Sequence, residues 1–264
     1  MKKILFLFFL ASFCSTTQAQ ITKRDSIAIT KAIAYLQDTA TRIDIPDYLV
    51  YDLLRRTHHL PAIRSRQYID TLCNGNEANF CKYYHFLRLI DAETLPLQQN
   101  KLHIYRETDS ITIQALWADK LTLNENYLLL LEYLSKKGKY ELTHAYLSLI
   151  WLKENNHWLV KTPYYATLEN TFKTKMIAIL TNRFGNYWLD IHSEILALLL
   201  YDGIDQENIK LTWINSMLNA QQKNGGWYYS LLNNETTAHS TVLALWALFA
   251  YTNTNKINYT WICH

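Results

Sequence analysis

Apolar residues in the last part of the chain are spaced at helical intervals, and the densest run is apolar on every face. From Val242 to Ala250 no residue is polar. A helix that is apolar all round must be surrounded by other elements or by lipid. The run is too short to span a bilayer, which needs about 20 residues. The pattern therefore predicts a buried inner helix of a layered helical protein.

The same pattern occurs three times at a nearly constant interval. His239 precedes the run just described, and His192 and His144 precede the upstream runs ILALLLY and LSLIWL. The three histidines are 48 and then 47 residues apart. A fixed period of about 20 to 50 residues is the signature of a repeat architecture.

A more amphipathic segment precedes each apolar run, over residues 124–137, 167–180 and 206–222. An amphipathic helix that leads into an all-apolar one, three times over, predicts an outer layer of helices around an inner layer. The predicted fold is all-α, an α/α toroid of outer and inner helix pairs. Three clear repeats occupy residues 121–264, and residues 20–120 are helical but irregular. No linker is visible, so 20–264 is predicted to be a single domain.

The turn before the last apolar run carries a motif. Gln221 or Gln222, Gly225 and Trp227 form Gln-x2or3-Gly-x-Trp, and a helix led by His239 follows. This stretch resembles the repeats of terpenoid cyclases and protein prenyltransferase β-subunits. The chain is similar to a short member of that α/α-toroid superfamily over about its last 140 residues. The resemblance implies helix pairs arranged around a central cavity.

Residues 1–19 have the composition of a secretory signal peptide. Two lysines are followed by an apolar core from Ile4 to Phe13 and by small residues before Gln20. The core is too short to span a membrane, so we expect cleavage after Ala19 and a secreted or periplasmic protein. No later segment reaches 18 uncharged apolar residues. We therefore expect no membrane span in the mature chain.

The charge balance narrows the class of partner. The chain has 26 basic and 23 acidic residues, a formal net charge of +3, and cleavage would remove two of the lysines. A near-neutral surface without a basic stripe argues against nucleic acid. A small molecule, a peptide and a protein remain as partners.

Two cysteines bracket a short loop. Cys73 and Cys81 are separated by seven residues, and an exported chain can close such a loop with a disulfide. The alternative is a pair of buried free thiols on a helix. Cys263 has no partner that the sequence identifies.

The three repeat-equivalent histidines, His144, His192 and His239, are the main candidate site. In a toroid the N-terminal ends of the inner helices converge on one mouth of the cavity, and three imidazoles with an open position make a catalytic zinc site. The resemblance implies the same for His239, which occupies the place of the zinc-binding histidine of prenyltransferase β-subunits. The aspartate and cysteine ligands of that family have no counterpart here. The alternative is structural, with the histidines marking repeated packing at helix ends.

Other candidates surround these histidines. Asp190 lies two residues before His192 and is either a general base that acts with it or a helix cap. Trp227 and Tyr228 are candidate ligand-binding aromatic residues, with core packing as the alternative. The acidic motifs by which terpenoid cyclases act are absent, as are Gly-x-Ser-x-Gly and His-Glu-x-x-His.

Two functions remain open from the sequence. The first is a secreted or periplasmic binding or interaction protein without a complete catalytic set, its ligand unidentified. The second is a zinc-assisted enzyme that acts on a peptide, isoprenoid or glycan substrate in the toroid cavity. The two differ in whether the histidines converge on a common point, because zinc ligands must lie about 2.0 to 2.1 Å from the ion.

Overall fold

The computed structural model describes most of the chain, namely residues 22–74, 83–94, 97, 100, 102, 105–183, 187–204, 208–230, 235–252 and 260–263. These residues form ten α-helices, two 3-10 helices and one two-stranded ribbon. The prediction of an all-α chain is confirmed. The predicted signal peptide and Cys81 lie outside the described residues, as does the side chain of Cys73, so the disulfide stays a prediction.

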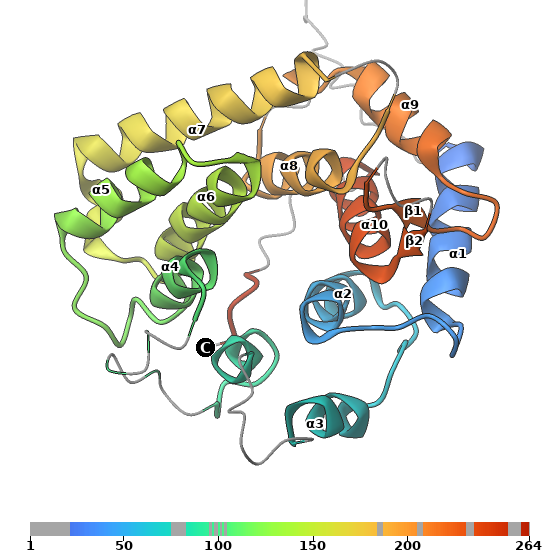
Figure 1. Cartoon of the computed structure of the whole chain (residues 1–264), viewed down its shortest axis with the longest axis horizontal. Helices are drawn as coiled ribbons and strands as arrows, with labels where there is room; N and C mark the ends of the chain where they lie inside the picture. The colour runs from blue at the N-terminus through green and yellow to red at the C-terminus, as the bar shows by residue number, and fades with distance from the viewer. Residues whose placement is uncertain are drawn as a thin grey trace, which may run out of the picture.

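Five helices form an inner row. They are α2 (Ile45–His58), α4 (Glu107–Leu116), α6 (Lys139–Glu154), α8 (Asp190–Tyr201) and α10 (Ala238–Thr252). Contacts join them in the order α4, α6, α8, α10 and α2. Figure 1 shows this row curving around the middle of the molecule.

Four helices lie outside this row, with bounds α1 (Lys23–Gln37), α5 (Glu125–Leu134), α7 (Pro163–Thr181) and α9 (Leu211–Ala220). Helix α5 packs on α6, α7 packs on α6 and α8, and α1 packs on α10. The remaining elements are α3 (Arg66–Asn74), η1 (Tyr84–Leu89), η3 (Trp158–Lys161) and the strands β1 (Trp227–Tyr228) and β2 (Thr236–Thr237). The long helix α7 crosses the outside of the row, and α9 and α1 continue that outer layer (Figure 1).

The inner helices all run in the same direction. Asp190, at the start of α8, accepts hydrogen bonds from Tyr140 near the start of α6 and from Ser240 near the start of α10. The first turn of α2 is likewise bonded to the first turn of α10. At the opposite end, Asn155 just after α6 donates to the carbonyl of Ala115 in the last turn of α4, at 2.8 Å. The five N-terminal ends therefore gather on one side of the molecule.

Burial separates the two layers. In α10 every residue from Val242 to Leu248 is at most 3% exposed. Helix α7 instead buries a single stripe at intervals of three and four residues, which is the spacing of one helix face, and its members are Tyr165, Leu168, Phe172, Met176 and Leu180. No helix in the described ranges is both long and apolar enough to cross a bilayer.

The Gln-Gly-Trp motif joins α1 to the turn that follows α9. The side-chain amide of Gln221 donates to the carbonyls of Ala28 and Gly225, both at 2.9 Å. The indole of Trp227 donates to the carbonyl of Met217 at 2.8 Å. The motif therefore holds helices together in this chain.

Gly225 makes this junction possible and provides a test of it. Its φ is +96°, and a Cβ there would collide with the backbone carbonyl of Lys31. We expect Gly225→Ala to lower the free energy of unfolding by more than about 1 kcal/mol, because the backbone conformation and the contact both oppose a side chain. Urea unfolding followed by circular dichroism measures this.

Gly203 supplies the matched control. Its φ is +80°, but nothing lies within 4 Å of the position of its Cβ. Gly203→Ala therefore carries only the backbone cost and should be the milder substitution. Equal losses of stability in the two variants would show that the contact between Gly225 and Lys31 imposes no constraint.

Candidate functional site

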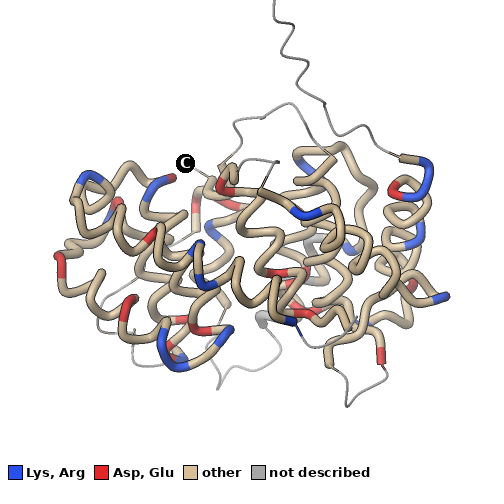
Figure 2. Tube along the Cα trace, turned by 90° about the horizontal axis from the view of Figure 1, so that it is seen from above, with Lys and Arg blue, Asp and Glu red and all other residues tan. Residues whose placement is uncertain are grey.

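The inner helices enclose a cavity of about 160 Å³. Each inner helix contributes one stripe to its lining, as α6 does with Tyr140, His144, Leu147 and Trp151. The lining is polar toward the N-terminal ends of the helices, where it includes Asp109, Tyr140, His144, Glu194 and His239. Toward the C-terminal ends it is apolar and aromatic. Figure 2 shows a group of acidic positions near the middle of the molecule.

His239 lies between two carboxylates at the polar end of the cavity. Its Nδ1 is 3.0 Å from a carboxylate oxygen of Asp47, and its Nε2 is 3.9 Å from a carboxylate oxygen of Asp190. The side chains of Asp47 and Asp190 are 7% and 0% exposed, whereas that of His239 is 39% exposed. The imidazole therefore faces both the solvent and two buried acids.

These neighbours decide the charge of His239. Burial alone would lower its pKa, but the hydrogen bond with Asp47 and the negative charges of Asp190 and Asp47 raise the pKa to about 9. The ring is thus an imidazolium at neutral pH. Both ring nitrogens carry a proton in that form, so a metal ion would have to displace one of them to bind.

Asp190 and Glu194 form the buried acidic part of the site, one turn apart on α8. Burial raises the pKa of Asp190, and the charge of His239 and the hydrogen bonds from Ser240 and Tyr140 oppose that rise. Burial raises the pKa of Glu194 to about 7, the charge of Asp190 adds to the effect, and a hydrogen bond with Thr143 opposes it. Glu194 therefore exchanges its proton near neutral pH, as a general acid or base must.

His144 lies on the same wall but stays neutral. Burial lowers its pKa, and the negative charge of Asp109 only partly offsets this. Its Nδ1 is buried and has no hydrogen-bond partner among the described residues. A buried polar atom without a partner costs free energy unless a water or a ligand satisfies it.

Tryptophans close the other end of the cavity. The ring of Trp261 packs edge-to-face against Trp151 and Trp246, with centroids 5.5 and 5.0 Å apart. Glu154 accepts hydrogen bonds from the backbone amides of Trp261 and Ile262, at 3.0 and 3.1 Å. This pair of bonds holds the segment 260–263 against the C-terminal ends of the inner helices.

His192 does not line the cavity. Its Nδ1 accepts a hydrogen bond from the backbone amide of Leu189, and its ring packs against Trp188 with centroids 5.5 Å apart. Burial and the nearby cations lower its pKa to about 4. The cavity-facing position of α8 is Glu194 instead, and an offset of two residues turns a side chain by about 200° around a helix.

His144 and His239 line the one cavity, and Asp190 contacts its polar end through its bonds to Tyr140 and Ser240. Trp227 is buried against Met217, away from that lining. Tyr228 lines a separate open hollow beside Gln222 and Glu235. In the described part of the chain, no three His, Cys, Asp or Glu side chains form a group that could hold a metal ion.

Sequence reasoning missed Asp47, Asp109 and Tyr140 as members of the site. Asp47 and Asp109 are each the third residue of an inner helix. Acidic residues are common in that first turn because they favour the helix dipole, so they carry no functional signal by themselves. Only the convergence of the helix starts gives them a shared role.

No protein-family model matches the chain, and neither a curated protein nor a solved structure matches it. The site must therefore be interpreted from its own geometry.

The pair Asp47 and His239 gives a direct test of the electrostatics. We expect the pKa of the His239 ring, measured by NMR titration, to be near 9 in the natural chain and to fall in Asp47→Asn, because the variant loses a negative charge next to the ring. Asp44→Asn is the matched control, since Asp44 starts the same helix but its side chain is 52% exposed and pairs with Arg42. An unchanged pKa in Asp47→Asn would contradict this description of the site.

The interaction between Asp47 and His239 should also change the free energy of unfolding with pH. A histidine pKa that is raised in the folded state adds stability that is fully present below about 6.5, the unfolded value. That contribution is lost as the pH rises through about 9. We therefore expect the difference in unfolding free energy between the natural chain and Asp47→Asn to shrink from pH 6 to pH 10. Urea unfolding at a series of pH values measures it.

Proposed function

We propose that the chain is a binding protein of the α/α-toroid type, and that its central cavity takes a small ligand with a cationic head and an aromatic or apolar body. The observation that carries this proposal is the excess of carboxylates over cations at one end of a cavity with an aromatic opposite end. The ligand class goes beyond what the sequence predicts, and the binding role is the one that the sequence favours.

The toroid is supported by the helix arrangement. Five inner helices run in parallel and contact one another in a curved row, and outer helices cover that row from outside. The segment 260–263 bonds to η1 through the amide of Cys263 and the carbonyl of Arg88, at 3.4 Å. A segment before the repeats and the segment after the last inner helix thus meet at the open side of the row. We propose the toroid on this arrangement together with the resemblance to terpenoid cyclases and prenyltransferase β-subunits.

Charge selects the head group of the ligand. The carboxylates of Asp47, Asp109, Asp190 and Glu194 face or adjoin the cavity, and His239 is the cation among them. The dipoles of the inner helices stabilise these carboxylates, which lie at the N-terminal ends. They supply only a partial positive charge, so the carboxylates can still pair with a cationic ligand. An ammonium group supplies the missing positive charge and donates hydrogen bonds to carboxylate oxygens.

Size and surface select the body of the ligand. A cavity of about 160 Å³ is close to the engineered cavity of about 150 Å³ that binds benzene. Phe86, Trp151 and Trp246 line its apolar part. Aromatic walls favour an aromatic or aliphatic group by burial, and they add cation–π attraction for a nearby ammonium. A small arylalkylamine has both properties.

A second candidate is an acid–base enzyme in the same cavity. Glu194, with a pKa near 7 beside Asp190 and a protonated His239, is the observation that favours it. The zinc-assisted form of the enzyme has less support, because His192 faces away from His144 and His239. Among the peptide, isoprenoid and glycan substrates considered from the sequence, the cavity volume fits only fragments of that size.

We propose a secreted or periplasmic location as well, on the composition of residues 1–19. Nucleic acid stays an unfavoured partner, since the formal charge of the chain is close to neutral.

Binding of benzylamine tests the proposal. We expect benzylamine, which is protonated at pH 8, to bind in the cavity and to change the tryptophan fluorescence, whereas benzoate should not. Glu194→Gln should weaken binding at least tenfold, which corresponds to about 1.4 kcal/mol. Affinity should also rise from pH 6 to pH 8, because Glu194 loses its proton with a pKa near 7 and gains the charge that attracts the amine. Isothermal titration calorimetry gives the affinities.

Two controls make the result decisive. Asp44→Asn removes one exposed carboxylate outside the cavity and should leave the affinity for benzylamine unchanged. Benzyl alcohol has the same ring without the charge and should bind more weakly. Equal binding of the alcohol and the amine would contradict the cationic head group. A variant Glu194→Gln that keeps its affinity but loses turnover of a substrate would favour the enzyme instead.

A further inference from the structure

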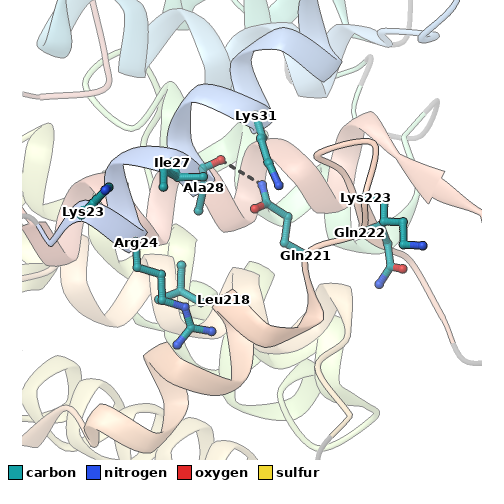
Figure 3. A pocket seen from close by; sticks show the side chains of 9 residues that line it. All are labelled: Lys23, Arg24, Ile27, Ala28, Lys31, Leu218, Gln221, Gln222 and Lys223. Carbon is teal, nitrogen blue, oxygen red and sulfur yellow. Dashed lines mark hydrogen bonds between the residues drawn. The ribbon is translucent and has the colours of Figure 1, made fainter.

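A second, basic hollow lies on the outside of the molecule between α1 and the end of α9. It has a volume of about 540 Å³ and is lined by Lys23, Arg24, Ile27, Ala28, Lys31, Leu218, Gln221, Gln222 and Lys223. We call it the α1–α9 groove. Figure 3 shows its side chains, with α1 on one side and the turn after α9 on the other. It shares no lining residue with the central cavity.

The charge of the groove has one sign. Four of its nine lining residues are cations and none is an acid. Within the described ranges, no carboxylate forms an ion pair with any of these four. The nearest acid on the same helix, Asp25, is 3% exposed and accepts hydrogen bonds from the backbone and hydroxyl of Thr22. The positive charge of the groove is therefore left for a partner.

The cations surround an apolar strip. Lys23, Ile27 and Lys31 follow one another at four-residue intervals and so lie along one face of α1. Ile27 is 48% exposed, so its apolar side chain is accessible between the two lysines. Leu218 of α9 completes the strip from the opposite wall. A ligand that fills the groove must pair acidic groups at its ends with an apolar group between them.

Hydrogen bonds join the walls of the groove. Arg24 reaches across the groove and donates to the side-chain oxygen of Asn219 at 2.5 Å, so a neutral acceptor positions it and its charge is retained. Gln221 bonds to the carbonyl of Ala28 on the facing helix (Figure 3). A preorganised groove costs a ligand less than one that must first be ordered.

The dimensions select an extended chain. The distance from Lys23 to Lys31 along the helix axis is about 12 Å, at 1.5 Å per residue. An extended peptide covers about 13 Å with four residues, at about 3.3 Å each. A flat bilayer surface touches protruding positions and leaves a hollow unfilled. These arguments favour a peptide over a lipid surface.

We propose that the α1–α9 groove binds a short, extended acidic peptide segment of a partner protein, with an apolar side chain on Ile27 and carboxylates on the flanking cations. The site is separate from the central cavity and does not depend on the function proposed for it. Binding should weaken with salt, because exposed charges are screened over about 10 Å at 0.1 M ionic strength.

Fluorescence anisotropy with a labelled peptide tests the proposal. The probe is the acetylated, amidated sequence Glu-Asp-Leu-Glu-Asp, with two comparison peptides in which the acids become their amides or the leucine becomes serine. We expect the acidic peptide to bind the full chain at low salt and both comparison peptides to bind at least tenfold more weakly. Lys31→Glu should weaken binding of the acidic peptide at least tenfold.

The control variant changes the same charge elsewhere. Lys161→Glu alters an exposed lysine at the end of η3, far from the groove in sequence and absent from its lining, and should keep the affinity within twofold. Absence of binding, or equal loss in Lys31→Glu and Lys161→Glu, would overturn the proposal. Co-sedimentation with vesicles of equal phosphatidylcholine and phosphatidylglycerol, without peptide binding, would assign an anionic lipid instead and also overturn it. Glu194→Gln should not affect this binding.

Discussion

Everything at the centre of this molecule depends on a carboxylate that is kept away from water. Asp190 is 1% exposed, and an isolated buried charge would cost several kcal/mol. Its two oxygens accept hydrogen bonds from Tyr140 and Ser240, and His239 brings a positive charge within 3.9 Å. These partners come from α6 and α10. One acid thus fixes the relative position of three inner helices, and the cavity follows from that arrangement.

The sequence predicted the helical class and the buried inner helix well, because both depend on local apolar spacing. The same spacing led us to expect His144, His192 and His239 at one site, and of these His144 and His239 line the cavity. The period of 47 to 48 residues wrongly placed His192 at the cavity. A repeat can keep its length while its inner helix is rotated about its own axis. Glu194 occupies the cavity-facing position there, and a count of residues cannot detect a rotation of two positions.

The remaining site residues lie beyond local patterns. Asp47 contacts His239 across 192 positions of sequence, and no periodicity connects the first inner helix with the last. Trp261 meets Trp151 and Trp246 from a segment that follows the last inner helix. These long-range contacts form only when the inner helices pack into the curved row. The charged site can therefore be recognised only in the folded structure, where the N-terminal ends of the inner helices lie together.

The junction between α1 and the turn after α9 has a consequence for how the protein is made. The bond from Gln221 to Ala28 joins residues 193 positions apart, and contacts of such separation form slowly because a long loop must first close. Asp47 and His239 depend on the same closure. A growing chain on the ribosome therefore lacks the groove on α1 until the turn after α9 has been synthesised, and it lacks the charged pair until α10 has begun. Both binding regions therefore form late in synthesis.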